Sequence, residues 1–267
     1  MEFLKVIKRR SFLNEVIYIS LNVILTIALV VIIRTTGSLL FAFALVLLSQ
    51  WRVFAIRPRF WFAHVQANMI SMIVSFSFVV FLYVANGAST GEPQTLLLQI
   101  FLSIMYVIWL LFLKSQSKRV YVVAQAGVAL FTGITAIFSM SYGWLASPVV
   151  LLVWLVGFAT AKQVLSVYDE ESHSIFLSII WGLVLSEIGW LAYHWTIAYR
   201  LPLLNGFLLP QVSIVMLSLG FLSYKSYDSF YNNKKIRFND IMLPLIFSVG
   251  IISILILAFN GISPGAA

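Results

Sequence analysis

Long apolar runs follow one another along almost the whole chain, and they constrain the fold more than any other feature. The first of them, at 16–33, contains no charged residue. Of the 267 residues, 61% are hydrophobic and 10% are charged, whereas a soluble domain carries about 25% charged residues. A soluble fold cannot hide this much apolar surface from water, so lipid must form part of the surroundings.

The apolar runs are about 18–25 residues long, the length that a helix needs to cross a bilayer. In hydrocarbon every backbone N–H and C=O needs an internal partner, which leaves only helices and closed barrels. A barrel strand alternates between lipid-facing and lumen-facing residues, and these runs do not alternate. The sequence therefore predicts an all-α polytopic membrane protein with about nine transmembrane helices, at 16–33, 36–52, 62–85, 94–113, 120–140, 144–163, 175–199, 204–224 and 241–259.

The distribution of positive charge supports this number of spans, because basic residues collect in cytoplasmic loops. With nine spans and a cytoplasmic N-terminus, only Arg34 and Arg200 fall on the external side. We therefore predict a cytoplasmic N-terminus and an external C-terminus. The remaining basic residues all fall on the cytoplasmic side: Lys5, Lys8, Arg9, Arg10, Arg52, Arg57, Arg59, Lys114, Lys118, Arg119, Lys162, Lys225, Lys234, Lys235 and Arg237.

The net charge of +8 then reflects topology and anionic lipid headgroups on the cytoplasmic side, and no nucleic-acid partner is predicted. The longest loop, KSYDSFYNNKKIRFND at 225–240, is too short for a soluble domain, so we expect one transmembrane domain over 1–267. The chain has no cysteine, which excludes disulfides and thiol catalysis. These features fit a multi-pass protein of a cell membrane, such as the bacterial cytoplasmic membrane.

Several classes of enzyme are excluded by the acidic residues, of which only Glu187 is predicted to lie deep in the membrane. Enzymes that hold Mg²⁺–diphosphate need carboxylate clusters, and intramembrane aspartyl proteases need two buried aspartates. Neither arrangement is present, nor is an HExxH, GxSxG or P-loop motif. The acidic run at 169–171 with His173 offers ligands for a cation, but it fits better a solvated turn before a span. No catalytic residue, metal site or cofactor is predicted.

Glu187 has no Lys or Arg near it within the predicted span 175–199. A bare carboxylate at that depth costs several kcal/mol, so the protonated, neutral carboxyl is the less costly state. At 100° per residue, Glu187, Trp190 and His194 form one stripe. A carboxyl that gains and loses a proton suits proton-coupled transport. The same residue also fits a structural carboxyl, and His194 also fits a group at the outer interface that simply contacts water.

Beside this stripe runs a face of small residues, Gly182, Ser186 and Gly189. Small faces let helix backbones approach closely, so we expect this side of the span to pack on protein. Glu187 is then expected to border a helix contact or a cavity rather than lipid.

A second polar line lies on the third span. His64, Asn68, Ser71 and Ser75 recur at spacings of four, three and four residues, which keeps them on one helix face. The line reaches about 16 Å into the membrane from the cytoplasmic edge. It suits the inner part of a path across the bilayer, and it also suits ordinary hydrogen bonding between packed helices.

Arg52, Arg57 and Arg59 form a third candidate site, beside two tryptophans in SQWRVFAIRPRFW. Arginines can clamp a phosphate or lipid headgroup through two parallel hydrogen bonds. Anchoring of the span by positive charge explains the same residues more simply.

Together these features favour a small-solute or proton-coupled transporter. Glu187 would be the proton-switching group, His194 an outer relay, and His64 with Asn68 the inner vestibule. Two alternatives stay open. The first is a non-catalytic subunit or scaffold of a larger membrane assembly, with membrane-protein partners or as a homo-oligomer, since catalytic motifs are absent and the loops are short. The second is a lipid-modifying membrane enzyme that uses the arginines and the deep histidines. No motif identifies a family.

Overall fold

The apolar runs form helices, as the need for internal backbone hydrogen bonds in hydrocarbon requires. The computed structural model describes residues 2–51, 61–87, 92–168, 171–195, 197–200 and 208–258, with the side chains of all but 2–15, 61–64, 92, 200 and 258. Seven of the described helices are long and apolar enough to cross a bilayer. The prediction of an all-α fold is confirmed, and the seven long apolar helices are consistent with a polytopic membrane protein.

The helices are α1 (Glu2–Thr36), α2 (Leu39–Ser49), α4 (Trp61–Gly87), α5 (Glu92–Ile108), α6 (Arg119–Met140), α7 (Ala146–Leu165), α8 (Ser174–His194), α9 (Gln211–Asn233) and α10 (Phe238–Ala258). A π-helical turn, η2 (Trp109–Leu113), continues α5. Strands β1 (Ala198–Arg200) and β2 (Leu208–Pro210) pair in antiparallel fashion between α8 and α9. Two of the nine predicted spans are not among the seven candidates: α2 has 11 residues, and α9 carries Lys225 and Asp228.

Six of the predicted spans agree with the observed helices to within about three residues, when η2 is counted with α5, and the other three are corrected. The first was expected to begin at residue 16, but α1 begins at Glu2. The seventh was expected to reach residue 199, but α8 ends at His194 because the chain turns into the β1–β2 pair. The eighth was expected at 204–224, but α9 begins at Gln211 and continues to Asn233. Most of the expected loop at 225–240 is therefore helix.

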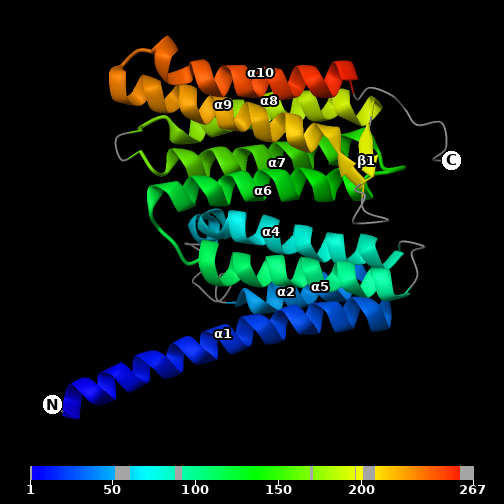
Figure 1. Ribbon diagram of the computed structural model, residues 1–267, viewed down its shortest axis with the longest axis vertical. Coiled ribbons are helices and arrows are strands. Elements are labelled where there is room, and N and C mark those ends of the chain that lie inside the picture. Colours follow the sequence, from blue (N-terminus) through cyan, green and yellow to red (C-terminus); the bar gives the residue numbers. More distant parts are fainter. Residues whose placement is uncertain are drawn as a thin grey trace.

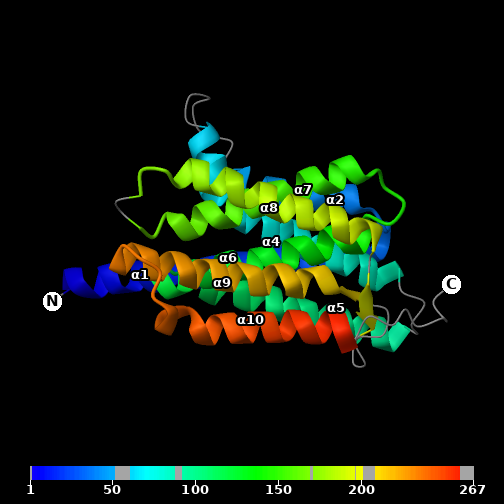
Figure 2. The ribbon, with the colours of Figure 1, turned by 90° about the horizontal axis from the view of Figure 1, so that it is seen from above.

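Successive helices run in opposite directions, so that α1, α4, α6, α8 and α10 all begin at one end of the bundle (Figure 1). We call this the basic end. Among the described side chains it holds eight of the nine cationic groups, whereas Arg34 lies in the last turn of α1 at the opposite end. α6 lies in the middle of the bundle and packs against α4, α7 and α9 (Figure 1, Figure 2). α10 packs against α9 at the edge.

Among the described helices, α7 and α8 have the most extensive contact, and glycines allow it. A Cβ placed on Gly182 would lie 2.9 Å from the backbone oxygen of Trp154, and one on Gly189 would lie 3.0 Å from Val153 Cγ1. Gly182, Ser186 and Gly189 are all buried. The prediction that this small face packs on protein is confirmed.

A glutamine on α6 hydrogen-bonds backbone carbonyls at the end of η2 and in the turn that follows it. Gln125 Nε2 donates to the carbonyls of Leu113 (2.6 Å) and Gln116 (2.9 Å). The Gln125 side-chain oxygen in turn accepts from Gln163 Nε2 of α7 at 3.4 Å. These bonds fasten η2, α6 and α7 together near the basic end. They matter because backbone carbonyls without partners are costly away from water.

Candidate functional sites

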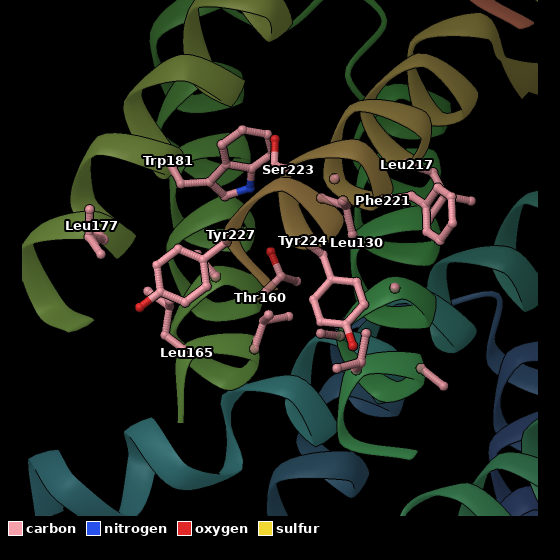
Figure 3. Close-up of a pocket in the computed structure, with 17 residues that line it drawn as sticks. Leu130, Thr160, Leu165, Leu177, Trp181, Leu217, Phe221, Ser223, Tyr224 and Tyr227 are labelled. Carbon is pink, nitrogen blue, oxygen red and sulfur yellow. The ribbon is translucent and has the colours of Figure 1, made fainter. Parts of the chain in front are cut away.

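A cavity of about 390 Å³ lies between α6, α7, α8 and α9 (Figure 3). It exists because α6 packs against both α7 and α9, whereas α8 contacts α9 little. Its volume falls in the range of pockets that hold small molecules, about 300–1,000 Å³. All four walls come from the half of the bundle near the basic end: Leu130 of α6, Thr160 of α7, Trp181 of α8 and Leu217 of α9 mark its inner limit.

The walls of this cavity are almost wholly apolar. Gly127 and Gly220 contribute no side chain, and a Cβ on Gly127 would lie 3.8 Å from Leu217 Cδ1, its nearest neighbour. Thr160 is the polar group on the α7 wall, and its hydroxyl donates to the carbonyl of Val156 in its own helix at 2.9 Å. The cavity therefore offers a ligand hydrocarbon contacts and few hydrogen bonds.

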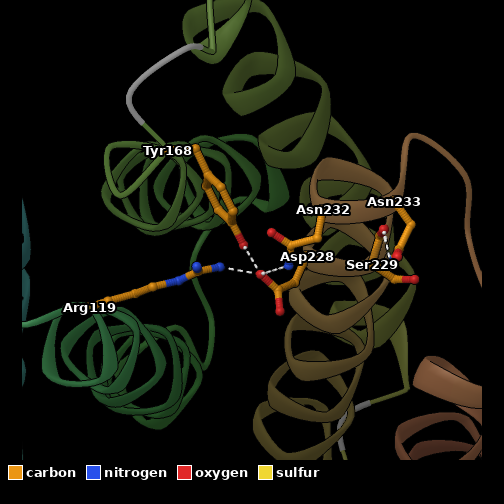
Figure 4. A network of polar contacts seen from close by, with 6 residues as sticks. All are labelled: Arg119, Tyr168, Asp228, Ser229, Asn232 and Asn233. Atoms are coloured by element: carbon orange, nitrogen blue, oxygen red, sulfur yellow. Dashed lines mark hydrogen bonds and ion pairs between the residues drawn. The ribbon is translucent and has the colours of Figure 1, made fainter.

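The basic end of the cavity is bordered by a cluster of tyrosines and carboxylates, here called the tyrosine–carboxylate cluster: Arg119, Tyr168, Glu171, Tyr227 and Asp228. Arg119 of α6 forms an ion pair with Asp228 of α9 (Figure 4). Tyr168, just after α7, donates its hydroxyl to the same Asp228 oxygen at 3.1 Å. Side chains from α6, from α9 and from the segment after α7 thus meet at one carboxylate.

The second carboxylate of the cluster joins α8 to α9. Glu171 accepts a hydrogen bond from the Tyr227 hydroxyl and another, at 2.9 Å, from the backbone N–H of His173. These bonds hold the pKa of Glu171 below its usual value. Burial and the neighbouring Asp228 carboxylate raise the pKa of Tyr168. The Tyr168 and Tyr227 rings pack edge to face, with 4.9 Å between their centroids.

Sequence reasoning missed this cluster, because it assigned Asp228 to a cytoplasmic loop. A signal was present: Tyr224, Tyr227, Asp228 and Tyr231 recur at spacings of three, one and three, which places them on one side of a helix. The polar residues around them lowered the hydropathy and hid the helix.

Glu187 lies on an exposed face of α8, and its side chain is exposed. The expectation that it borders a helix contact or cavity is therefore wrong. Trp190 is 50% exposed and His194 is exposed, and their rings pack edge to face with centroids 5.0 Å apart. The stripe predicted from helical spacing thus exists, but it faces outward from the bundle.

A groove of about 580 Å³ runs beside this stripe, between α7 and α8 in the half of the bundle away from the basic end. Trp154 and Leu151 of α7 form one wall, and Leu183, Ser186 and Trp190 of α8 form the other. Neither this groove nor the cavity near the basic end is lined by Glu187.

The polar line on α4 is placed inside the bundle. Ser71 and Ser75 are buried and Asn68 is half-buried. Ser75 Oγ donates to the Ser71 carbonyl at 2.8 Å and accepts the Tyr106 hydroxyl of α5 at 2.9 Å. The Ser71 hydroxyl is buried without a hydrogen-bond partner. The line faces α5, so the structure does not bring it together with Glu187.

The other sequence-predicted groups lie partly outside what the structure describes. Arg52, Arg57 and Arg59 fall outside the described residues, as does the side chain of His64. Within the described part of the chain, no group of three or more His, Asp or Glu side chains could hold a metal ion.

Comparison with known proteins yields no match to any protein-family model, curated protein or solved structure.

Proposed function

We propose that the protein is a non-catalytic subunit of a larger membrane assembly, and that α8 contacts a transmembrane helix of a partner protein. The observation that carries this proposal is the exposed carboxyl of Glu187 on a helix long and apolar enough to cross the bilayer. A charged side chain that faces lipid near the centre of a transmembrane helix costs about 2.5–3.5 kcal/mol on insertion scales. Contact with a partner that hydrogen-bonds the carboxyl removes this cost.

The surroundings of Glu187 support a helical partner. Leu183, Trp190 and Leu191 are exposed on the same side of α8 and supply an apolar surface around the carboxyl. The groove between α7 and α8 lies alongside. A helix packed here would place its side chains in the groove and against Glu187. Intramembrane carboxyl groups in packed bundles face protein and pair with polar groups.

The partner that fits is a different protein that presents a hydrogen-bond donor, such as Lys, His or Gln, opposite Glu187. A second copy of this chain, related by a two-fold axis along the membrane normal, would bring Glu187 against its own copy. Two carboxylates at that distance repel, so only one of them could be charged. A donor from another protein has no such restriction.

The placement in the membrane is part of the same proposal. The short α2 and the polar-ended α9 complete nine crossings, and the basic end faces the cytoplasm of the cell membrane. The eight described cations at that end support this orientation, because basic residues collect on the cytoplasmic side. Proton transport through Glu187 stays a prediction, and it would need a hydrated pathway that reaches this outward-facing carboxyl.

Site-specific photocrosslinking in native membranes tests the proposal. A photoreactive amino acid replaces Leu183 or Leu191, one helical turn on either side of Glu187, and Ile246 on the exposed face of α10 serves as the matched control. We expect both α8 positions to label one discrete membrane protein, at a transmembrane peptide that contains a donor residue. The Ile246 position should label lipid.

The same experiment with Glu187 varied decides the role of the carboxyl. Glu187→Gln should keep the crosslink, because the amide still hydrogen-bonds, whereas Glu187→Ala should weaken it. Labelling of lipid alone from α8, or of a second copy of this chain, would overturn the proposal. Loss of a proton-driven flux in Glu187→Gln vesicles would instead support transport.

A further inference from the structure

The cavity between α6, α7, α8 and α9 has the depth of one membrane leaflet. Along α9 it extends from Tyr227 to Leu217, ten residues or about 15 Å of helix. The hydrocarbon core of a bilayer is about 30 Å thick, so the cavity spans roughly one leaflet. We propose that it binds the hydrocarbon chain of an anionic phospholipid drawn from the leaflet at the basic end.

The chemistry of the walls selects a hydrocarbon chain over water or a polar solute. A buried water needs two to four polar partners. The Thr160 hydroxyl is already bonded within α7, and the Tyr227 hydroxyl is bonded to Glu171. Most of the remaining lining is aromatic and aliphatic surface, such as that of Trp181, Phe221 and Leu130, and Ser223 and Tyr224 add two hydroxyls. Apolar surface of this kind is stabilised by contact with methylene groups.

The cavity is accessible from the surface of the bundle. Two lining residues, Ala124 of α6 and Phe221 of α9, are exposed. They belong to helices whose outer surface is surrounded by lipid in the proposed membrane placement. Lipid chains are therefore the molecules that meet the opening at the highest concentration.

The charges beside the basic end of the cavity favour an anionic headgroup. Lys162 directly follows the lining residue Ala161, and Lys225 Nζ lies 5.5 Å from the ring centroid of the lining residue Tyr224. Among the described residues the one ion pair is Arg119 with Asp228, so both lysines keep their charge for other partners. Basic pockets between transmembrane helices at the cytoplasmic side bind anionic headgroups.

The neighbouring carboxylates do not cancel this preference. Asp228 is engaged by Arg119 and Tyr168, and Glu171 is engaged by Tyr227 and the backbone of His173. A phosphate beside Lys162 and Lys225 would accept charge-assisted hydrogen bonds from their ammonium groups. The inference is independent of the proposed contact at α8, because the two surfaces share neither residues nor position.

The test uses the full-length protein in phosphatidylcholine vesicles that contain a small fraction of phosphatidylglycerol with a photoreactive group on its acyl chain. After illumination, labelled peptides are mapped by mass spectrometry. We expect the label to concentrate on 123–130 and 217–227, above the level found on the exposed face of α10. In the wild-type protein, labelling spread evenly over the exposed helices would by itself overturn the proposal.

Two sets of variants test separately the site for the hydrocarbon chain and the preference for an anionic headgroup. Ala161→Trp fills the cavity and should reduce labelling of 123–130 and 217–227 to the level on α10. Ala44→Trp, at an exposed position on α2, is the matched control and should leave labelling unchanged. Unchanged labelling in a folded Ala161→Trp protein would overturn the site.

The charge is tested with photoreactive phosphatidylcholine in place of phosphatidylglycerol. The wild-type protein should prefer the anionic lipid, and the double variant Lys162→Gln, Lys225→Gln should lose that preference while it keeps the phosphatidylcholine label. Equal labelling by both lipids in the wild-type protein would overturn the assignment of an anionic ligand.

Discussion

Gly157 of α7 and Gly182 of α8 face each other so closely that a Cβ placed on Gly157 would lie 3.1 Å from the Cα of Gly182. The backbones of the two helices therefore touch at a point where no side chain fits. Close approach of this kind is a common way to pack helices in a bilayer, where apolar side chains gain nothing by leaving lipid.

Gly182→Ala should therefore destabilise the protein by about 1–3 kcal/mol, the usual cost of overpacking. The added Cβ would lie 2.9 Å from the Trp154 backbone oxygen, which cannot move aside as a flexible side chain can. Thermal unfolding in detergent measures the loss. Gly250→Ala on α10 is the matched control, because a Cβ there meets nothing within 4 Å. Equal effects of the two substitutions would contradict the close α7–α8 contact.

The polar line on α4 gives a second prediction, which separates a packing role from a role in transport. Ser75→Ala should cost about 1–3 kcal/mol, because it leaves the buried Tyr106 hydroxyl without its partner. Ser71→Ala should be neutral or stabilising, because the Ser71 hydroxyl has no partner to lose. Denaturation of the two variants, side by side in one detergent, measures the difference. If Ser71→Ala abolished a transport flux while leaving stability unchanged, the line would be more than packing.

Acidification should weaken the link between α8 and α9. The hydrogen bonds from Tyr227 and His173 lower the pKa of Glu171, so they favour its charged form in the folded protein. Their contribution is complete above the unfolded pKa of a glutamate, about 4.3, and is lost as the pH falls through the lower folded pKa. The thermal midpoint, followed through that range, should fall less steeply with acid in Tyr227→Phe than in the wild-type protein. Parallel pH profiles would show that Glu171 does not contribute.

Glu187→Leu should leave the fold of the isolated protein intact, because the side chain is exposed. Insertion of α8 into a membrane should become more favourable by about 3 kcal/mol, as expected when a charged group at such a depth is removed. An insertion assay that scores glycosylation of flanking segments measures this gain. Ser186→Leu, at the neighbouring buried position, is the control and should unfold the α7–α8 contact. Unfolding by Glu187→Leu would mean that the carboxyl is buried after all.

The helical class and the approximate limits of most helices follow from hydropathy alone, because a run such as 120–140 must match the thickness of the bilayer. The limits of α8 and α9 do not. Their connection pairs as β1 and β2, which hydropathy does not register, and the second half of α9 is polar because it contributes Tyr227 and Asp228 to contacts between helices.

The orientation of Glu187 could have been derived from its own helix. At 100° per residue it lies about 140° around α8 from Gly182, nearly opposite the face that packs on α7. Placing it toward protein required a second neighbour for α8, and no sequence pattern reveals which helices touch. The cavity escaped prediction for the same reason, since its walls come from α6, α7, α8 and α9.

The Glu171–Tyr227 hydrogen bond connects α8 and α9 at the basic end. The β1–β2 pair connects the same two helices at the other end. The strands are joined by backbone hydrogen bonds, whereas Glu171 and Tyr227 are joined through their side chains at the end of the bundle. Thermal motion will thus separate α8 from α9 first beside Tyr227. A guest molecule between them would leave toward the lysines and not toward the strands.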